Sequence, residues 1–409
     1  MGSITLQKSK NTSCKSEITI TGSKSESNRL LLLKALYPEI CLENVSNSDD
    51  SQLMTKALIS SSNIVDIHHA GTAMRFLTAY FSIQEGQEVT LTGSKRMKER
   101  PIKILVDALQ DLGADISYVE NEGFPPIKIK GNKLTKNKVS LKANVSSQYI
   151  SALLLIASKL ENGIVLTLEG EITSVPYIKM TLSLLDEIGV ESSFINNTIT
   201  VKPKTQNLKS KTLTVESDWS SASYYFSIVA LSEVGTEITL SSYKENSLQG
   251  DSALVNIYKE FGVETTFLNN TIILKKEAQN LTPKTFNLVN APDIAQTIAV
   301  TCFALGVPCD LKGLHTLKIK ETDRLVALKT EIEKLGGKVD ITNDSLLLHA
   351  SKSIKEMISI ETYHDHRMAM AFAPLALKTS IIIEDAMVVS KSYPTFWDDL
   401  KSIGFKISE

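Results

Sequence analysis

The sequence is poor in cysteine, with Cys14, Cys41, Cys302 and Cys309 the four present in 409 residues. None of them forms a CxxC pair or has ligand-like spacing to the histidines, so a zinc site and a disulfide framework are both poor interpretations. We therefore expect free thiols. Cys302, in the run TIAVTCFALG, is expected to be a small buried hydrophobic residue.

The chain also lacks an excess of either charge, because 44 basic and 46 acidic side chains leave a formal net charge of −2. It has no global positive field to hold a nucleic-acid backbone or an anionic membrane, so an anion site has to be local. No apolar run reaches the roughly 18 residues of a membrane-spanning helix, and the N-terminus lacks a signal-peptide core. We expect a cytosolic monomer that binds neither nucleic acid nor membrane.

What the sequence does contain suits a soluble globular fold, with 42% hydrophobic and 22% charged residues. Its length exceeds one ordinary core, which favours two domains. The polar, basic stretch at 201–212 lacks apolar periodicity and predicts one crossover between domains, and a second is expected near residue 20. The predicted domains are residues 1–20 plus 214–409, and residues 21–213.

One pattern recurs five times: an amphipathic run ends in a hydrophobic residue and glycine, and an alternating strand follows. The copies are DLGADISY at 111, EIGVESSF at 187, EFGVETTF at 260, KLGGKVDI at 334 and SIGFKISE at 402. Each predicts a helix with glycine as its C-cap, followed by a strand. A sixth, degraded copy is expected to end near residues 60–66.

Three copies continue into a predicted hairpin whose tip is Asn196–Asn197, Asn269–Asn270 or Asn343–Asp344, residues that tolerate the positive φ of a tight turn. Segments 30–36, 150–160, 222–231 and 295–305 predict buried helices. The pattern predicts an α/β fold of six repeat units, three per domain, with helices inside and sheets outside.

Several predicted helix starts combine hydroxyls, glycine and cations. They are TGSKSESNR at 21–29, AGTAMR at 70–75, RMKERP at 96–101, SSQ at 146–148 and SVPY at 174–177. Backbone N–H groups and the helix dipole make such starts good anion sites. Capping by hydroxyls and solvated charge explain each one singly. Their recurrence indicates converging helix starts around a multiply anionic ligand.

The second half adds carboxylates and cations in NAPDIAQ at 290–296, KETDR at 320–324, HDHR at 364–367 and KSYP at 391–394. Arginine forks suit carboxylate and phosphate oxygens, and Asp293 or Glu321 would move protons if neighbours tuned its pKa. The alternative for Glu321 and Arg324 is an ordinary surface pair. His364 and His366 lie two residues apart, which suits neither common helical metal motif, so no metal is expected.

In their order and spacing, these motifs resemble the EPSP synthase family of enolpyruvyl transferases over essentially the whole chain. The resemblance implies a two-domain inside-out α/β barrel, each domain having three βαβαββ units, with the active site in the interdomain cleft. It also implies that no cofactor is needed. The substrates would be phosphoenolpyruvate, bound mainly by domain 1 (1–20 plus 214–409), and shikimate 3-phosphate, bound mainly by domain 2 (21–213).

The resemblance also implies roles for single residues. The catalytic residues would be Asp293, Glu321 and Lys24. The shikimate 3-phosphate contacts would be Lys24, Ser25, Arg29, Ser146, Ser147, Ser174, Asp293 and Lys320. The phosphoenolpyruvate contacts would be Lys24, Gly71, Arg100, Gln148, Arg324, Arg367 and Lys391. Four positions depart from the commonest family pattern, namely His69, Phe76, Val175 and Thr316.

The implied reaction is addition followed by elimination. Asp293 takes the proton of the shikimate 5-hydroxyl, Glu321 or Lys24 protonates the methylene carbon of phosphoenolpyruvate, and the tetrahedral ketal then loses phosphate. Two rivals stay open. A sister enzyme acting on UDP-N-acetylglucosamine is disfavoured because no cysteine lies in RMKERP, and a non-catalytic anion-binding protein is disfavoured by the presence of both carboxylates.

Overall fold

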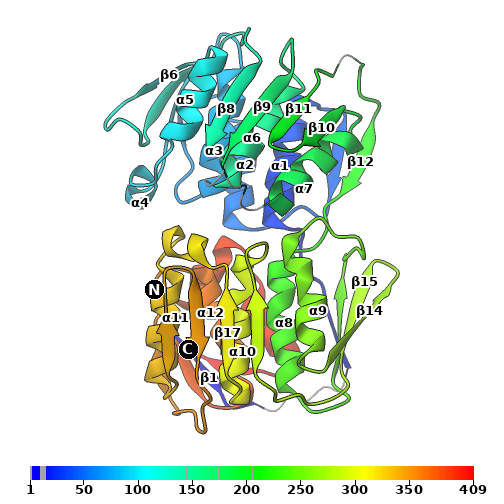
Figure 1. Ribbon diagram of the computed structural model, residues 1–409, viewed down its shortest axis with the longest axis vertical. Helices are drawn as coiled ribbons and strands as arrows, with labels where there is room; N and C mark the ends of the chain where they lie inside the picture. Colours follow the sequence, from blue (N-terminus) through cyan, green and yellow to red (C-terminus); the bar gives the residue numbers. More distant parts are fainter. Residues whose placement is uncertain (1, 10–14, 143–145, 171, 173–174, 205) are drawn as a thin grey trace. The chain divides into compact units, whose positions relative to one another are not determined.

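The computed structural model describes residues 2–9, 15–142, 146–170, 172, 175–204 and 206–409. The chain forms two compact units, which we describe one at a time (Figure 1). Unit 1 comprises Met1–Thr21 and Glu216–Glu409, and unit 2 comprises Gly22–Val215.

Within its described residues, unit 2 contains three sheets. Their strand orders are β4 (Ile64–Asp66), β5 (Glu88–Thr92), β7 (Ile127–Lys130), β6 (Asp115–Tyr118); β10 (Ser192–Ile195), β11 (Thr198–Val201), β9 (Ile164–Glu169), β8 (Lys138–Lys142); and β12 (Lys211–Thr214), β3 (Ile40–Glu43). Its helices are α1 (Lys24–Leu36), α2 (Asp49–Leu58), α3 (Gly71–Ser82), α4 (Lys95–Lys98), α5 (Lys103–Leu112), α6 (Ser147–Ala157) and α7 (Val175–Glu187).

Unit 1 also has three sheets among the residues described. Their orders are β20 (Ile358–Ile360), β21 (Ile381–Ile383), β1 (Ile4–Gln7), β22 (Lys406–Ser408); β14 (Val263–Leu268), β15 (Thr271–Lys276), β13 (Glu237–Ser241), β2 (Lys15–Ile18); and β16 (Lys284–Asn287), β17 (Cys309–Lys312), β19 (Ser345–Leu348), β18 (Val339–Ile341). Its α-helices are α8 (Trp219–Leu231), α9 (Leu254–Lys259), α10 (Ala295–Leu305), α11 (Arg324–Lys334), α12 (His366–Phe372) and α13 (Phe396–Ser402).

Short 3₁₀ turns precede or follow the helices of unit 1. They are η1 (Gly250–Ala253), η2 (Pro292–Ile294), η3 (His315–Ile319), η4 (Ala373–Leu377) and η5 (Ala386–Lys391). In each four-stranded sheet, one parallel pair of strands is extended by antiparallel pairing. The sheet of β20 and β21 is completed by β1, which pairs antiparallel with both β21 and β22.

The predicted glycine turns are confirmed. All five repeat glycines have positive φ, with values of 109° at Gly113, 76° at Gly189, 78° at Gly262, 100° at Gly336 and 101° at Gly404. Glycine adopts this left-handed conformation without the steric cost that a Cβ imposes. Each glycine therefore ends a helix and redirects the chain into the outer strand that follows.

The predicted hairpins between neighbouring strands are also present. Ile195 pairs with Thr198 and Leu268 with Thr271, which leaves Asn196–Asn197 and Asn269–Asn270 as two-residue tips. Asn196, Asn269 and Asn270 have the positive φ expected of such turns, whereas Asn197 does not. In the third hairpin Thr342 N donates to Ser345 O, which leaves Asn343–Asp344 as the tip, but neither residue has the predicted positive φ.

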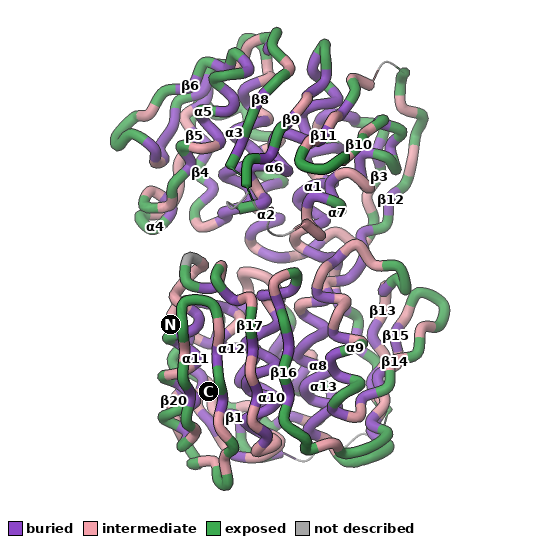
Figure 2. Tube along the Cα trace, in the orientation of Figure 1, coloured by how far each residue is buried: buried purple, intermediate pink, exposed green. Residues whose placement is uncertain are grey.

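Three of the helices predicted to be buried, α6, α8 and α10, form the cores of the units (Figure 2). The prediction for 30–36 holds in part, because Lys34 is exposed and Leu31 and Ala35 are half-buried. Every residue of α6 except Gln148, and every residue of α8 except Ser220, is buried. Helix α10 is buried up to Leu305, and Cys302 lies within it, as predicted. Since each core helix is apolar on nearly all sides, it has to be enclosed by other helices and by sheets.

One part of the repeat prediction is wrong. Residues 64–66 do not end a degraded copy; they form β4, which pairs in parallel with β5 and opens the next sheet. The connection from α2, residues 59–63, is too short to hold a hairpin. The sheet of β3 and β12 therefore has two strands within the described residues. Across those same residues, we find no helix with the length and apolarity needed to cross a membrane.

The repeat glycines predict unequal effects on stability. Gly336→Ala should lower the free energy of unfolding by about 1–2 kcal/mol, which is the cost of placing a residue with a Cβ in the left-handed conformation. No steric clash adds to this cost, because the atom nearest to the new Cβ would be 3.7 Å away. In Gly262→Ala the Cβ would lie 2.0 Å from the Ala278 carbonyl oxygen, which adds roughly 1–3 kcal/mol. Urea unfolding of both variants, which lie in the same unit, measures the difference. Equal losses would contradict the packing argument.

Candidate active site

Three helices of unit 1 begin with an aspartate that caps the helix. Asp218 accepts from Ser221 N at 3.0 Å, Asp323 from Leu325 N at 3.1 Å, and Asp365 from Arg367 N at 2.8 Å. These caps satisfy backbone donors that have no partner inside the helix. These caps also fix the charged residues beside them.

Arg324 is the centre of the unit 1 cluster. Its buried guanidinium donates through Nε to Asp365 at 2.6 Å, through Nη1 to Asp293 at 2.8 Å and through Nη2 to Glu321 at 2.8 Å. Burial alone would lower the pKa of Arg324, but the three carboxylates outweigh that effect and raise it. The pair of Glu321 and Arg324 is thus part of a buried network and not a solvated surface pair.

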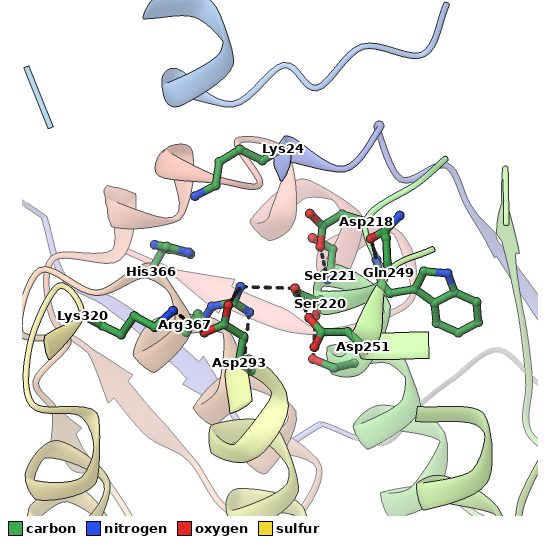
Figure 3. Close-up of polar contacts among 12 residues, drawn as sticks. Lys24, Asp218, Ser220, Ser221, Gln249, Asp251, Asp293, Lys320, His366 and Arg367 are labelled. Atoms are coloured by element: carbon green, nitrogen blue, oxygen red, sulfur yellow. Dashed lines mark hydrogen bonds and ion pairs between the residues drawn. The ribbon is translucent and has the colours of Figure 1, made fainter. Parts of the chain in front are cut away.

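Two further cations face Asp293 (Figure 3). Lys320 Nζ lies 3.4 Å from Asp293 Oδ1, and Arg367 Nη2 lies 3.4 Å from Oδ2. Arg367 also donates to the Asp293 backbone oxygen at 3.2 Å. Burial would lower the pKa of Arg367, but Asp293 and other acidic neighbours raise it well above its usual value. Both Asp293 oxygens are therefore in the field of fixed positive charge.

Lys391 joins the same region through the backbone. At the end of η5, its Nζ donates to the His364 carbonyl oxygen at 2.7 Å. Tyr363 and His364 have positive φ of 53° and 55°, and the Asp365 cap follows directly. Unit 1 thus brings together its sequence-predicted residues, Asp293, Lys320, Glu321, Arg324 and Arg367, and connects Lys391 to their loop.

In unit 2, Lys24 opens α1 behind the capping residue Ser23. Lys24 Nζ lies 3.6 Å from Asp50 Oδ2, and His69 Nε2 lies 3.6 Å from Asp50 Oδ1. His68 Nδ1 is 2.7 Å from His69 Nδ1. Asp50, which the sequence analysis did not single out, therefore joins α1 to the segment preceding α3.

Gly71 and Arg100 lie against each other. A Cβ at Gly71 would be 2.5 Å from Arg100 Nη1, so the guanidinium occupies the space that a side chain would need. Buried Arg75 donates to the carbonyl oxygens of Gly71 at 3.1 Å and Pro101 at 3.2 Å. Burial lowers the pKa of Arg75 to about 10, and repulsion by Arg100 adds to that shift. Arg75 thus joins the two motifs to which Gly71 and Arg100 belong.

Gln148 and the serines before it lie at the start of α6. Gln148 Nε2 donates to Thr72 Oγ1 at 3.1 Å, beside Gly71. Ser146 is exposed and caps the helix by accepting from Gln148 N at 3.3 Å, and Ser147 is buried. Gln148 is the one residue of this apolar helix that is not buried.

Arg29 is placed differently from the other predicted cations. Its guanidinium is buried and donates to Thr181 Oγ1 at 2.8 Å, Ser25 O at 2.6 Å and Ser151 Oγ at 2.9 Å. Burial lowers its pKa to about 10. In this structure Arg29 links α1, α6 and α7, and a contact of Arg29 with a substrate stays a prediction.

The positions that depart from the family pattern have clear surroundings. Phe76 is buried, with the Arg29 guanidinium carbon 5.4 Å from its ring centre. Val175 opens α7, and Thr316 lies in η3. Ser174 and Cys14 lie outside the described residues.

The sequence analysis missed several residues of these clusters. Asp365 and Arg75 stand inside motifs that the sequence analysis quoted. The role of Asp365 depends on its buried ion pair with Arg324, and the role of Arg75 on its hydrogen bonds to two carbonyl oxygens, which the motifs alone do not reveal. Asp50, Ser220 and Asp251 carried no signal, because each acts on a residue far away in the sequence.

The comparison with protein families matches residues 57–400 to the model of EPSP synthase, 3-phosphoshikimate 1-carboxyvinyltransferase. Among curated proteins, the 3-phosphoshikimate 1-carboxyvinyltransferase of Bacteroides fragilis is 48% identical over 398 residues, which cover 96% of each chain. The enzyme of that name from Photobacterium damsela subsp. piscicida is 35% identical, over 95% of this chain and 96% of its own.

The comparison with solved structures finds the same fold. EPSP synthase from Acinetobacter baumannii has a TM-score of 0.81 at 21% identity, covering 100% of both chains. The enolpyruvyl transferase NikO from Streptomyces tendae has a TM-score of 0.75 at 13% identity, covering 100% of this chain and 99% of its own. The two-domain α/β fold expected from the sequence is confirmed. The family model matches most of the chain, and curated relatives are up to 48% identical over nearly its whole length. This protein therefore belongs to the EPSP synthase family.

Proposed function

We propose that the cluster around Arg324 moves the protons of the EPSP synthase reaction in this chain. The family reaction transfers the enolpyruvyl group of phosphoenolpyruvate to the 5-hydroxyl of shikimate 3-phosphate, giving 5-enolpyruvylshikimate 3-phosphate and phosphate. The observation that carries the proposal is that Asp293 and Glu321 are each held 2.8 Å from the same buried guanidinium. Two carboxylates fixed on one guanidinium provide one group to accept a proton and another that, once protonated, can donate one.

The addition step uses both groups. Asp293 accepts the proton of the 5-hydroxyl as that oxygen bonds to C2 of phosphoenolpyruvate, while Glu321 or Lys24 donates a proton to the methylene carbon. The product is a tetrahedral ketal that still carries the phosphate. In the elimination, the carbon–oxygen bond to phosphate breaks and the leaving phosphate takes the proton held by Asp293. The new methyl group returns its proton to Glu321 or Lys24, which regenerates the vinyl double bond.

The cations supply binding and orientation. Both substrates carry a phosphate and a carboxylate, for which guanidinium groups are suitable partners. We assign Arg324, Arg367 and Lys391 in unit 1, with Lys24, Gly71, Arg100 and Gln148 in unit 2, to phosphoenolpyruvate. Fixed positive charge aimed at developing negative charge stabilises the transition state with little reorganisation.

For shikimate 3-phosphate we assign Lys24, Ser25, Ser146, Ser147, Asp293 and Lys320, with Arg29 and Ser174 as contacts expected from the family resemblance. The proximity of Lys320 to Asp293, 3.4 Å, supports their acting on one substrate. A cytosolic location and a monomeric state stay predictions from the sequence.

The carboxylates give the first functional prediction. Asp293→Asn and Glu321→Gln should each lower kcat by about 10²–10⁴-fold, the usual contribution of a positioned acid or base. Steady-state phosphate release measures kcat, and thermal unfolding checks the fold. The control is Asp310→Asn, since Asp310 pairs with Lys312 at 3.2 Å on β17, outside the cluster. Near-parental kcat in both variants would remove the two carboxylates from the mechanism.

Arg100 gives a prediction about substrate binding. Arg100→Ala should raise KM for phosphoenolpyruvate at least about tenfold, as expected for one lost charged hydrogen bond, and KM for shikimate 3-phosphate much less. Arg96→Ala is the matched control, because the Arg96 side chain is 64% exposed and pairs with Glu99 at 3.0 Å. Equal increases of both KM values would show that Arg100 is wrongly assigned.

The acceptor is tested directly. Purified protein with phosphoenolpyruvate should release phosphate when shikimate 3-phosphate is added and none when UDP-N-acetylglucosamine is added. Colorimetric phosphate detection with each acceptor at equal concentration distinguishes the outcomes. Release with the nucleotide sugar alone would indicate the sister reaction, and release with neither would indicate a binding protein.

A further inference from the structure

A buried carboxylate outside the assigned set adjoins the cluster of unit 1. Asp251 lies in η1 and is 6% exposed. Its Oδ2 accepts a hydrogen bond from Ser220 Oγ at 2.6 Å (Figure 3). Ser220 is in the first turn of α8 and is the one residue of that helix that is not buried.

Ser220 connects Asp251 to Arg367. The Ser220 oxygen accepts from Arg367 Nη2 at 3.2 Å, and the same Nη2 lies 3.4 Å from Asp293 Oδ2. Figure 3 shows the three groups in a row, with the guanidinium between Ser220 and Asp293. Asp251, Ser220, Arg367 and Asp293 thus form a continuous chain of polar contacts.

The direction of these hydrogen bonds depends on Asp251. A hydroxyl has one hydrogen, and an ionised carboxylate only accepts, so Ser220 gives its hydrogen to Asp251 and turns a lone pair toward Arg367. A protonated Asp251 would instead donate to Ser220. The serine hydrogen would then have no fixed acceptor, and the Ser220 oxygen would no longer be held with a lone pair toward Arg367.

The position of Asp251 is fixed by its neighbour Gln249. Gln249 Oε1 accepts from Trp219 N at 3.0 Å, and Gln249 Nε2 donates to Ser217 O at 2.9 Å. Both contacts are at the start of α8, on either side of the cap Asp218. They hold η1 against that helix start and keep Asp251 within reach of Ser220.

We propose that Asp251 is a positioning residue for Arg367, acting through Ser220. With Asp251 ionised, the guanidinium keeps an anchor that does not depend on the Asp293 carboxylate. Arg367 then stays in place for phosphoenolpyruvate when Asp293 turns to the 5-hydroxyl of the acceptor. This inference rests on the proposed function, in which Arg367 binds phosphoenolpyruvate and Asp293 accepts a proton.

The charges around Asp251 agree with such a role. Burial, and then repulsion by Asp293, raise the pKa of Asp251 to about 6, although Arg367 and the Ser220 hydrogen bond lower it; Asp218 raises it further. Buried Tyr224 faces Arg367 and Asp218 from α8. An unfolded aspartate has a pKa near 3.8, so folding favours the protonated form of Asp251. The protonated carboxyl therefore adds to the free energy of unfolding at low pH, and this contribution is lost as pH rises through about 6. At neutral pH the ionised group therefore destabilises the fold.

The test compares Asp251→Leu, which cannot accept a hydrogen bond from Ser220, and Ser220→Ala with the parent protein. Both variants should raise KM for phosphoenolpyruvate about tenfold, the effect of one lost hydrogen bond to a charged group, with kcat and KM for shikimate 3-phosphate changed less than about threefold. The substrate phosphates also titrate near pH 6, so all proteins are compared in one buffer series. The fall of kcat/KM for phosphoenolpyruvate below pH 6.5 should be less steep in both variants than in the parent.

Stability separates positioning from simple packing. Asp251→Leu keeps the branched shape of the side chain and removes the buried charge, so its Tm at pH 7.5 should equal or exceed that of the parent. Ser252→Ala, one residue along η1, is the matched control and should leave both KM values unchanged. An unchanged KM for phosphoenolpyruvate in both variants would overturn the inference. So would an equal increase of KM for phosphoenolpyruvate and for shikimate 3-phosphate together with a lower Tm.

The parent protein is measured first, because it distinguishes the two levels of the argument. An inactive parent contradicts the proposed function, and the role of Asp251 with it. An active parent whose pH profile and KM for phosphoenolpyruvate match those of both variants contradicts the role of Asp251 alone.

Discussion

The contact on which the unit 1 site depends is the buried guanidinium of Arg324 with three carboxylates. Asp293, Glu321 and Asp365 come from η2, the segment before α11 and the cap of α12. Removing one partner from a buried ion pair typically costs about 3–5 kcal/mol, because the remaining charge is left uncompensated. The same interaction therefore holds three chain segments together and keeps at fixed places the two carboxylates to which we assign proton transfer.

This arrangement follows from the way the repeat is built. A core helix enclosed by apolar neighbours can expose polar groups only near its ends. Capping aspartates and serines fix those ends, and Lys24, Gln148, Ser220 and Arg324 each stand one or two residues after such a cap. The caps and the proposed site residues are thus products of one local pattern.

Much of the fold was predictable because its signals are local. The glycines at 113, 189, 262, 336 and 404 need only a left-handed residue after a helix, which a five-residue window reveals. The absence of a hairpin after α2 was harder to predict, since the sequence of residues 59–63 does not distinguish a short connection from the start of a hairpin.

Candidate site residues that stand in motifs could be predicted from the sequence. Those whose role depends on contacts between distant parts of the chain could not. Arg324 and Asp293 stand in recognisable segments. Arg29 stands in one too, yet its buried partners Thr181 and Ser151 are distant in sequence and give it an internal setting that no motif conveys. Asp251 lies in the turn before α9, and its importance follows only from the position of Ser220.

The pairing of β1 with β21 and β22 has a consequence for biosynthesis. Unit 2 is one uninterrupted stretch of chain, so all of its contacts are available once residue 215 has left the ribosome. Strand β1 precedes unit 2 in the chain but stays without its neighbours until both β21 and β22 have been translated. Domains generally fold as units during synthesis, so we expect unit 2 to acquire its structure before β1 is paired.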